Sequence, residues 1–222
     1  MPVVPITYQA SDDKMYEMTN GMNIFAGGAM YLQYGAATSY TNSVAETSLY
    51  LGITTVPANG ASSTTTGNFG INYPIDQSSL VIPAGALSPG TVFHIRQFGT
   101  IATTGTPTLR VRPGLVNTAG TFTAISDTGT PTIGAITGTC EFIAEYEVVC
   151  TAIGTSGQVG VRGTVTYGTN STTLVTTALS IPYATTTIDT TQAWTIDLRA
   201  TWGSASASNV LINKAGYIRI IG

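Results

Sequence analysis

Short runs of alternating hydrophobic and polar residues dominate the chain from about residue 46 onward. β-branched residues fill these runs, and clusters of Gly, Pro, Ser and Asn separate them. A period of two predicts strands with one buried face, and turn residues at this spacing are typical of an all-β sandwich or barrel. The strands expected are Glu46–Thr54, Ser79–Ile82, Thr91–Ile101, Pro107–Val116, Phe122–Ile125, Cys140–Ile153, Gln158–Tyr167, Thr172–Ile181, Ala193–Thr201 and Asn209–Ile220. They fit one jelly-roll β-sandwich of about eight strands over residues 46–222.

The strand expected at 193–201 has the clearest division into two faces. Trp194 lies on an apolar face that extends to Trp202, and we expect this face to be buried. Thr195, Asp197 and Arg199 lie on the other face, which we expect to contact solvent. Prolines are expected at strand ends, where a missing N–H group costs least; these are Pro83, Pro107, Pro113 and Pro182.

Cys140 and Cys150 lie in one expected strand and on the same face of it. Their separation along the strand would be roughly 33 Å. A disulfide requires Cα atoms within about 7 Å of each other. We therefore expect two buried free thiols.

Few side chains indicate catalysis. His94 is the one histidine, and we expect a satisfied or partly exposed strand residue, because a zinc site needs further His or Cys ligands. Glu145 and Glu147 lie on one face of one strand, as solvated carboxylates do, whereas glycoside hydrolysis needs two facing carboxyls about 5–10 Å apart. The chain has no Gly-x-Ser-x-Gly elbow, calcium loop or phosphate-binding glycine motif. We expect no catalytic residue, cofactor or metal ion.

The first 45 residues differ from the rest. All five methionines and several tyrosines fall there, and clear periodicity is missing. We interpret residues 1–45 as an extended N-terminal arm that orders on a partner; a strand or coil packed on its own domain is the alternative. The residues expected to anchor this arm are Met15, Tyr16, Met18, Met22, Phe25, Met30, Tyr31 and Tyr34.

Composition narrows the class of partner. Only 9% of the residues are charged, and eight Lys and Arg are outnumbered by eleven Asp and Glu, which argues against nucleic acid as a partner. No stretch approaches ~18 uninterrupted apolar residues, so we expect no membrane-spanning helix. No secretory signal is expected at the start of the chain. Threonine supplies much of the polar surface and loses less side-chain freedom on contact than lysine, which suits packing against other subunits.

Two segments resemble virion proteins of tailed bacteriophages. Ser79–Leu109 reads SLVIPAGALSPGTVFHIRQFGTIATTGTPTL and resembles a segment with Ser-Leu-x-Ile-Pro-Ala, a short turn, a strand ending in Gly, and Thr-Thr-Gly-Thr-Pro-Thr-Leu. Ala193–Asn209 reads AWTIDLRATWGSASASN and resembles a strand and turn near the end of the same proteins. The resemblance implies a jelly-roll domain encoded among head and tail genes, and it carries no catalytic residue.

The function implied by this resemblance is structural and non-enzymatic. We expect a capsid decoration (cement) protein on the surface of the virion, assembled in the host cytoplasm. It would be a homotrimer that binds the major capsid protein and bridges neighbouring capsid subunits. The alternative is a tail-fibre or receptor-binding module with a carbohydrate-binding site, which needs exposed aromatic residues such as Tyr73 and Tyr183. A glycan-degrading enzyme is a third class, and it would lose turnover on Glu145→Gln.

Overall fold

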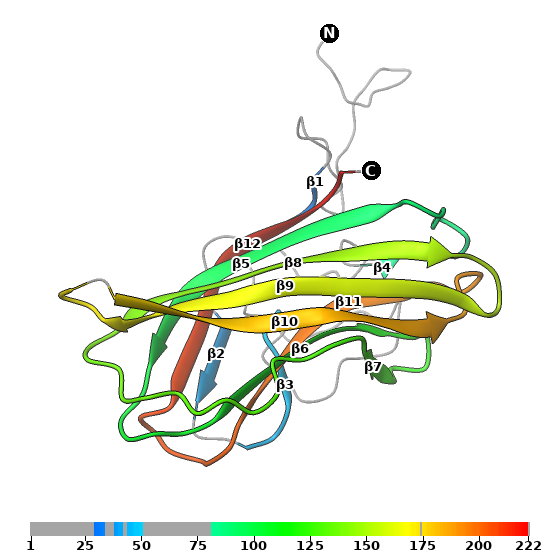
Figure 1. Cartoon of the computed structure of the whole chain (residues 1–222). Coiled ribbons are helices and arrows are strands. Elements are labelled where there is room, and N and C mark those ends of the chain that lie inside the picture. The colour runs from blue at the N-terminus through cyan, green and yellow to red at the C-terminus, as the bar shows by residue number, and fades with distance from the viewer. Residues whose placement is uncertain (1–28, 34–37, 42–43, 51–80, 174, 222) are drawn as a thin grey trace, which may run out of the picture.

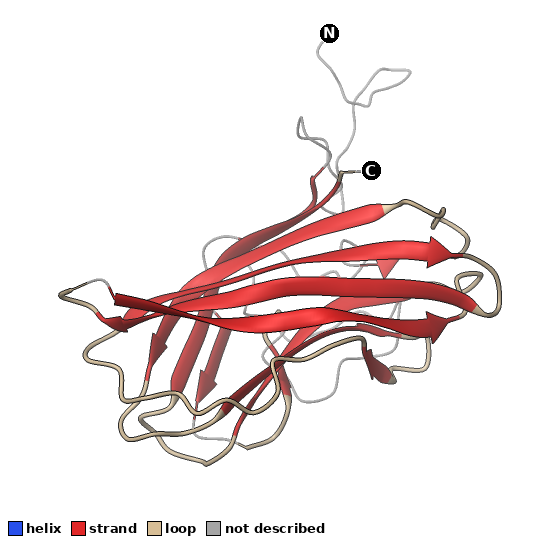
Figure 2. Ribbon diagram, viewed as in Figure 1, coloured by secondary structure: helices blue, strands red, loops and turns tan. Residues whose placement is uncertain are grey.

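The computed structural model of the chain describes residues 29–33, 38–41, 44–50, 81–173 and 175–221. These residues form strands and loops without a helix (Figure 2), which confirms the all-β prediction. No helix in this described part is long and apolar enough to cross a membrane. The strands are β1 (Ala29–Gln33), β2 (Thr38–Thr41), β3 (Thr47–Ser48), β4 (Val81–Ile82), β5 (Val92–Ala102), β6 (Leu109–Val116), β7 (Phe122–Ala124), β8 (Cys140–Ala152), β9 (Gly157–Asn170), β10 (Val175–Ile188), β11 (Trp194–Trp202) and β12 (Val210–Ile220).

The strands form two antiparallel sheets that share one hydrophobic core (Figure 1). The large sheet has the order β1-β12-β5-β8-β9-β10, with β2 also paired to β12. The small sheet has the order β3-β11-β6-β7, with β4 also paired to β11. The arch from β5 to β6 therefore lies beside the arch from β11 to β12, because β12 pairs with β5 and β11 pairs with β6.

The inner faces follow the predicted alternation. In β8 every second residue from Cys140 to Cys150 is buried, and in β9 the inward positions include Val159 and Tyr167 while Arg162 is exposed. The inner face of β11 is also buried, including both tryptophans. Burial of these large apolar side chains supplies the main stabilisation of the fold.

Both cysteines are free and buried, as predicted. Burial raises the pKa of the Cys140 thiol and of the Cys150 thiol, so little of the reactive thiolate forms at neutral pH. We expect both thiols to react slowly with a thiol-specific reagent in the native protein and quickly in denaturant. Two fast-reacting thiols in the native state would contradict this placement.

A group of polar side chains is buried between the sheets. The Asn213 amide nitrogen donates to the Leu49 carbonyl at 2.9 Å and to Gln97 Oε1 at 3.0 Å. The hydroxyls of Tyr50 and Tyr146 are 2.9 Å apart, and burial raises the pKa of both. These contacts join the segment after β3 to β5, β8 and β12, so they fix where this segment enters the core.

The prediction that the second face of β11 contacts solvent is wrong. Thr195, Asp197 and Arg199 are all buried, although they lie on the face away from the core. The Phe122 ring of β7 lies 4.1 Å from the Arg199 guanidinium carbon, and Glu46 also contacts Arg199. Side chains from β7 and from the chain before β3 therefore cover this face at Arg199.

Two prolines lie inside strands, where the sequence analysis placed them at strand ends. Pro113 lies within β6, and its carbonyl accepts the Ile125 N–H on the side of β7. Its ring nitrogen faces the same side, beyond the end of β7, so the missing N–H breaks no hydrogen bond between the strands. Pro182 lies in the middle of β10, where the register with β9 shifts between Ile181 and Ala184. The Pro182 carbonyl accepts a hydrogen bond from Ser126 Oγ at 2.7 Å. A β-bulge thus lets β10 continue beyond the proline.

The pentapeptide Thr-Gly-Thr-Pro-Thr occurs at 104–108 and at 128–132, and its two copies pair with each other. Thr108 and Thr132 form an antiparallel bridge, flanked by reciprocal backbone hydrogen bonds to the two prolines. Gly105 and Gly129 occupy the same place in each copy, with φ of 80° and 71°. This left-handed conformation favours glycine, which explains why both copies carry it.

Part of the segment 1–45 pairs with the large sheet. β1 runs antiparallel along residues 216–219 of β12, and β2 runs along residues 210–213 of the same strand. Neither strand was located from the sequence, but their pairing with β12 agrees with the alternative of a strand packed on its own domain. Among the expected anchors, Met30 and Tyr31 belong to β1. The others, Met15, Tyr16, Met18, Met22, Phe25 and Tyr34, lie outside the described residues, so the role of the arm stays a prediction.

Candidate functional site

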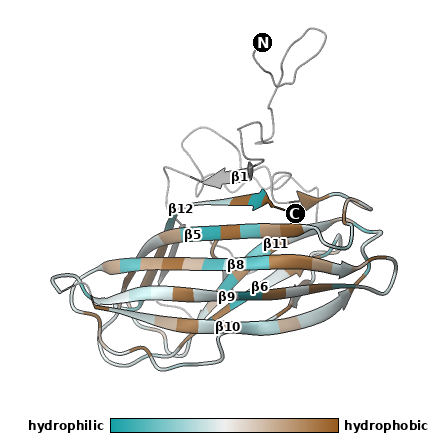
Figure 3. Ribbon diagram, turned by 45° about the horizontal axis from the view of Figure 1, so that its top comes forward, coloured by the Kyte–Doolittle hydropathy of each residue, from teal (hydrophilic) through white to brown (hydrophobic). Residues whose placement is uncertain are grey.

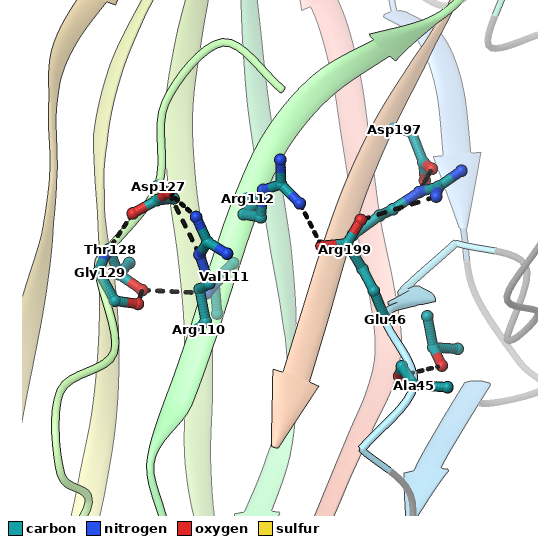
Figure 4. Close-up of polar contacts among 11 residues, drawn as sticks. Ala45, Glu46, Arg110, Val111, Arg112, Asp127, Thr128, Gly129, Asp197 and Arg199 are labelled. Carbon is teal, nitrogen blue, oxygen red and sulfur yellow. Dashed lines mark hydrogen bonds and ion pairs between the residues drawn. The ribbon is translucent and has the colours of Figure 1, made fainter. Parts of the chain in front are cut away.

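Charged side chains gather at two places in the described part of the chain. One is the outer face of the small sheet, shown in Figure 4, and we call it the Arg199 cluster. The other is a groove of about 400 Å³ on the outer face of the large sheet, which we call the β5–β10 groove. The Arg199 cluster comprises Glu46, Ser48, Arg110, Arg112, Phe122, Asp127, Asp197 and Arg199.

Asp197 and Arg199 form the buried centre of the Arg199 cluster. They lie two residues apart on β11, so both project from the same face. Arg199 Nε donates to Asp197 Oδ2 at 2.7 Å, and Ser48 Oγ donates to Asp197 Oδ1 at 2.6 Å. Asp197 is only 2% exposed. Burial raises the pKa of Asp197, and the nearby Arg199 and the Ser48 hydrogen bond offset only part of this effect.

Glu46 links β11 to β6 (Figure 4). Its carboxylate is 2.6 Å from a terminal nitrogen of Arg112 and 3.7 Å from one of Arg199. The Phe122 ring is close to both guanidinium groups, at 5.5 Å from Arg112 and 4.1 Å from Arg199. Cation–π contact and ion pairing therefore act on the same two arginines.

Arg110 extends the Arg199 cluster to the loop after β7 (Figure 4). It makes two hydrogen bonds to Asp127 Oδ2, at 2.6 and 3.2 Å, and Asp127 Oδ1 accepts the Gly129 N–H. Partial burial acts to raise the pKa of Asp127, but the hydrogen bonds from Arg110 and Gly129 outweigh it and leave the pKa below its usual range. The three arginines thus balance three carboxylates. We interpret the Arg199 cluster as a structural element that holds β3, β6, β11 and residues 122–129 together.

The β5–β10 groove crosses four strands of the large sheet and is open to solvent. Figure 3 looks onto this sheet, with polar bands of β5 and β8 lying beside one another. Hydrogen-bond acceptors and donors alternate along the lining of the groove, and an aromatic ring lies at its β10 side. The lining residues are His94, Glu145, Tyr146, Glu147, Arg162, Gly163, Thr164, Ser180, Ile181, Pro182 and Tyr183.

Strand register brings the charged residues of the groove together. His94 lies opposite Glu147 across β5 and β8, and Glu147 lies opposite Arg162 across β8 and β9. The His94 Nε2–H donates to Glu145 Oε2 at 3.0 Å, and Arg162 donates to Glu147 Oε2 at 3.1 Å. Arg96 lies 3.9 Å from Glu145. In formal charge, Arg96 and Arg162 balance Glu145 and Glu147.

Tyr183 lies at the bulge of β10, where Pro182 and Tyr183 together oppose Arg162. A Cβ atom on Gly160 would come within 3.1 Å of the Tyr183 hydroxyl, so the tyrosine reaches over this glycine on the outer face of the sheet. Tyr183 is 62% exposed. The bulge therefore places an exposed aromatic side chain at the β10 side of the groove.

The sequence pattern placed Glu145 and Glu147 on a solvated face but did not predict the association of the groove residues. It predicted His94 as a strand residue and Glu145 and Glu147 as solvated carboxylates. The structure places all three in one groove and in ion pairs or hydrogen bonds. Both glutamates project from the same face of β8, so they lie side by side on one strand and not on opposite sides of the groove.

No three His, Cys, Asp or Glu side chains gather as a possible metal site within the described ranges. Comparison with protein-family models, with curated proteins and with solved structures finds no match.

Proposed function

We propose that the chain is a structural, non-enzymatic subunit of a bacteriophage particle, a capsid decoration protein. The observation that carries this proposal is the meeting of its two phage-like segments. Ser79–Leu109 includes β4 and β5, and Ala193–Asn209 includes β11 and the following turn. β4 pairs with the start of β11, and the Gly203 N–H donates to the Thr108 carbonyl beyond its end. The two segments that resemble phage virion proteins are thus far apart in sequence but in contact in the folded chain.

The sheet topology supports the finer assignment of a jelly roll. Two arches, β5 to β6 and β11 to β12, lie side by side across both sheets. Adjacent antiparallel arches of this kind are a feature of Greek-key sandwiches, including jelly rolls. Such a domain is a rigid body that a capsid surface could hold in one orientation.

The exposed surface of β10 also supports a role in assembly. Small side chains with little rotamer freedom dominate it, so contact with a neighbouring subunit costs little side-chain entropy. The exposed hydroxyl residues on this strand are Thr176, Thr177, Ser180, Thr185 and Thr187. A trimer of such domains, each with an arm over the shell, would bury apolar surface across the boundaries of capsid subunits. Each Å² buried contributes about 25 cal/mol, from which the cost of ordering the arm is subtracted.

Deletion of residues 1–28 tests the arm. Deletion of residues 1–28 is preferable to deletion of residues 1–45, because it leaves β1 and β2 paired with β12. We expect the deleted protein to keep its melting temperature and to lose co-sedimentation with phage heads that bind the full chain. Undiminished binding would remove the arm from the proposal.

Mass and location test the particle role itself. Light scattering of the full chain is expected to give the mass of a trimer, and immunogold images of virions are expected to label the head. Labelling of the tail alone would favour the tail-fibre alternative. A monomer that is absent from purified virions would refute the proposal.

A further inference from the structure

We propose that the β5–β10 groove binds a neutral saccharide. The inference rests on the groove alone and holds for a decoration subunit or for a tail component. Three observations carry it: an exposed aromatic ring at one side, alternating donors and acceptors along the floor, and a charge balance near zero.

The aromatic ring of Tyr183 offers an apolar surface beside a polar groove. One face of a pyranose ring carries C–H groups and packs on aromatic rings, while its hydroxyls need hydrogen-bond partners around the edge. Tyr183 is 62% exposed, and the bulge at Pro182 directs it onto the outer face of the sheet above Gly160. Amphipathic groups of this kind suit ligands with one apolar and one polar side.

The floor of the groove matches the hydroxyls of a sugar. Each sugar hydroxyl donates and accepts, so it is best satisfied between a carboxylate and a donor. The Glu147 carboxylate and the Arg162 guanidinium lie 3.1 Å apart and so present an acceptor beside a donor. Thr164 and Ser180, paired across β9 and β10, add hydroxyls that do both.

Charged side chains at the β5 side of the groove are paired with each other. His94 Nε2 lies 3.0 Å from Glu145 Oε2, within hydrogen-bonding distance of that carboxylate. The ion pairs of Glu145 with Arg96 and of Glu147 with Arg162 neutralise the groove. A ligand with a strong net charge of either sign would gain little from such a surface, which favours a neutral saccharide.

A glycan array probed with the full-length chain gives the first test, and neutral hexose and N-acetylhexosamine oligosaccharides are the ligands expected to score. Titration calorimetry with the best neutral glycan then compares three variants. We expect Tyr183→Ala to weaken binding at least tenfold, and Tyr183→Phe to keep most of it because the ring remains. Val175→Ala, an exposed change elsewhere on β10, is the matched control and should leave the affinity unchanged.

Each other outcome overturns the proposal. No neutral glycan bound at millimolar concentration would show that the groove is not a saccharide site. Equal affinity of Tyr183→Ala and wild type would place any binding elsewhere, and preference for anionic glycans alone would contradict the charge argument. The melting temperature of Tyr183→Ala should match wild type, since the side chain is exposed, so lost binding would not reflect unfolding. These results are independent of particle binding, which the arm deletion tests.

Discussion

Replacement of Arg199 by leucine is expected to lower the free energy of unfolding by about 3–5 kcal/mol, the cost typical of breaking a buried ion pair from one side. Asp197 would lose the Arg199 guanidinium while remaining 2% exposed, and would be left with hydrogen bonds from the Ser48 hydroxyl and the Leu198 backbone. Glu46 would lose one of its two arginine partners, and Phe122 would lose the closer guanidinium. Denaturant unfolding followed by tryptophan fluorescence measures the change.

A matched control separates buried from exposed ion pairs. Arg162→Leu removes an arginine that is paired with Glu147 but has a side chain 68% exposed. Its effect should stay within about 0.5–1 kcal/mol, because exposed pairs contribute little. Equal decreases in the free energy of unfolding for Arg162→Leu and Arg199→Leu would contradict a structural role for the Arg199 cluster.

The decrease in the free energy of unfolding caused by Arg199→Leu should depend on pH. Burial raises the pKa of Asp197 in the folded protein, and loss of Arg199 raises it further. The folded state then binds more protons than the unfolded state between the two pKa values, so stability falls as pH rises through that window. We therefore expect the difference between variant and wild type to shrink as the pH is lowered below the folded pKa. A difference that is constant with pH would mean that Asp197 does not carry the effect.

Asn213→Ala is expected to lower the free energy of unfolding by about 2–4 kcal/mol, since it leaves buried acceptors without a donor. Asn213 is fully buried and donates to the Leu49 carbonyl and to Gln97 Oε1. The adjacent Lys214→Ala, at an exposed position, is the control and should change stability by less than about 0.5 kcal/mol.

A double variant tests whether polarity or packing causes the loss. In Asn213→Leu with Gln97→Leu, both side-chain partners become apolar, and replacing both partners can be nearly neutral. We expect the double variant to be more stable than the sum of the single losses predicts, as measured by a double-mutant cycle. Strict additivity would show that Asn213 and Gln97 do not act as a pair.

Local alternation was enough to predict most strands. β8, β9 and β11 carry mostly apolar residues at every second position, so both their location and their inner face could be predicted. β1 and β2 lack such alternation, and their pairing depends on the edge of β12, which a local pattern does not reveal. The second half of β10 was missed because Pro182 normally ends a strand, whereas here a bulge absorbs it.

Contacts between strands distant in sequence account for the remaining differences. The outer face of β11 has the polar pattern of a solvated face, but residues distant in sequence, among them Glu46 and Phe122, contact it and help to bury Arg199. The β5–β10 groove likewise depends on register, because Glu145 meets His94 only when β5 and β8 are aligned as they are. Residue types could identify candidates on each strand, but the pairing of strands decides which of them share a site.

The interruption of β10 at Pro182 affects how copies of this protein meet at high local concentration. A long, regular edge strand is a template on which identical chains add to each other and grow into fibrils. Here the proline lacks a donor, the bulge breaks the repeat, and Ser126 already occupies the Pro182 carbonyl. We therefore expect the edge to resist amyloid-like growth, so that many copies can crowd together and still remain separate folded units.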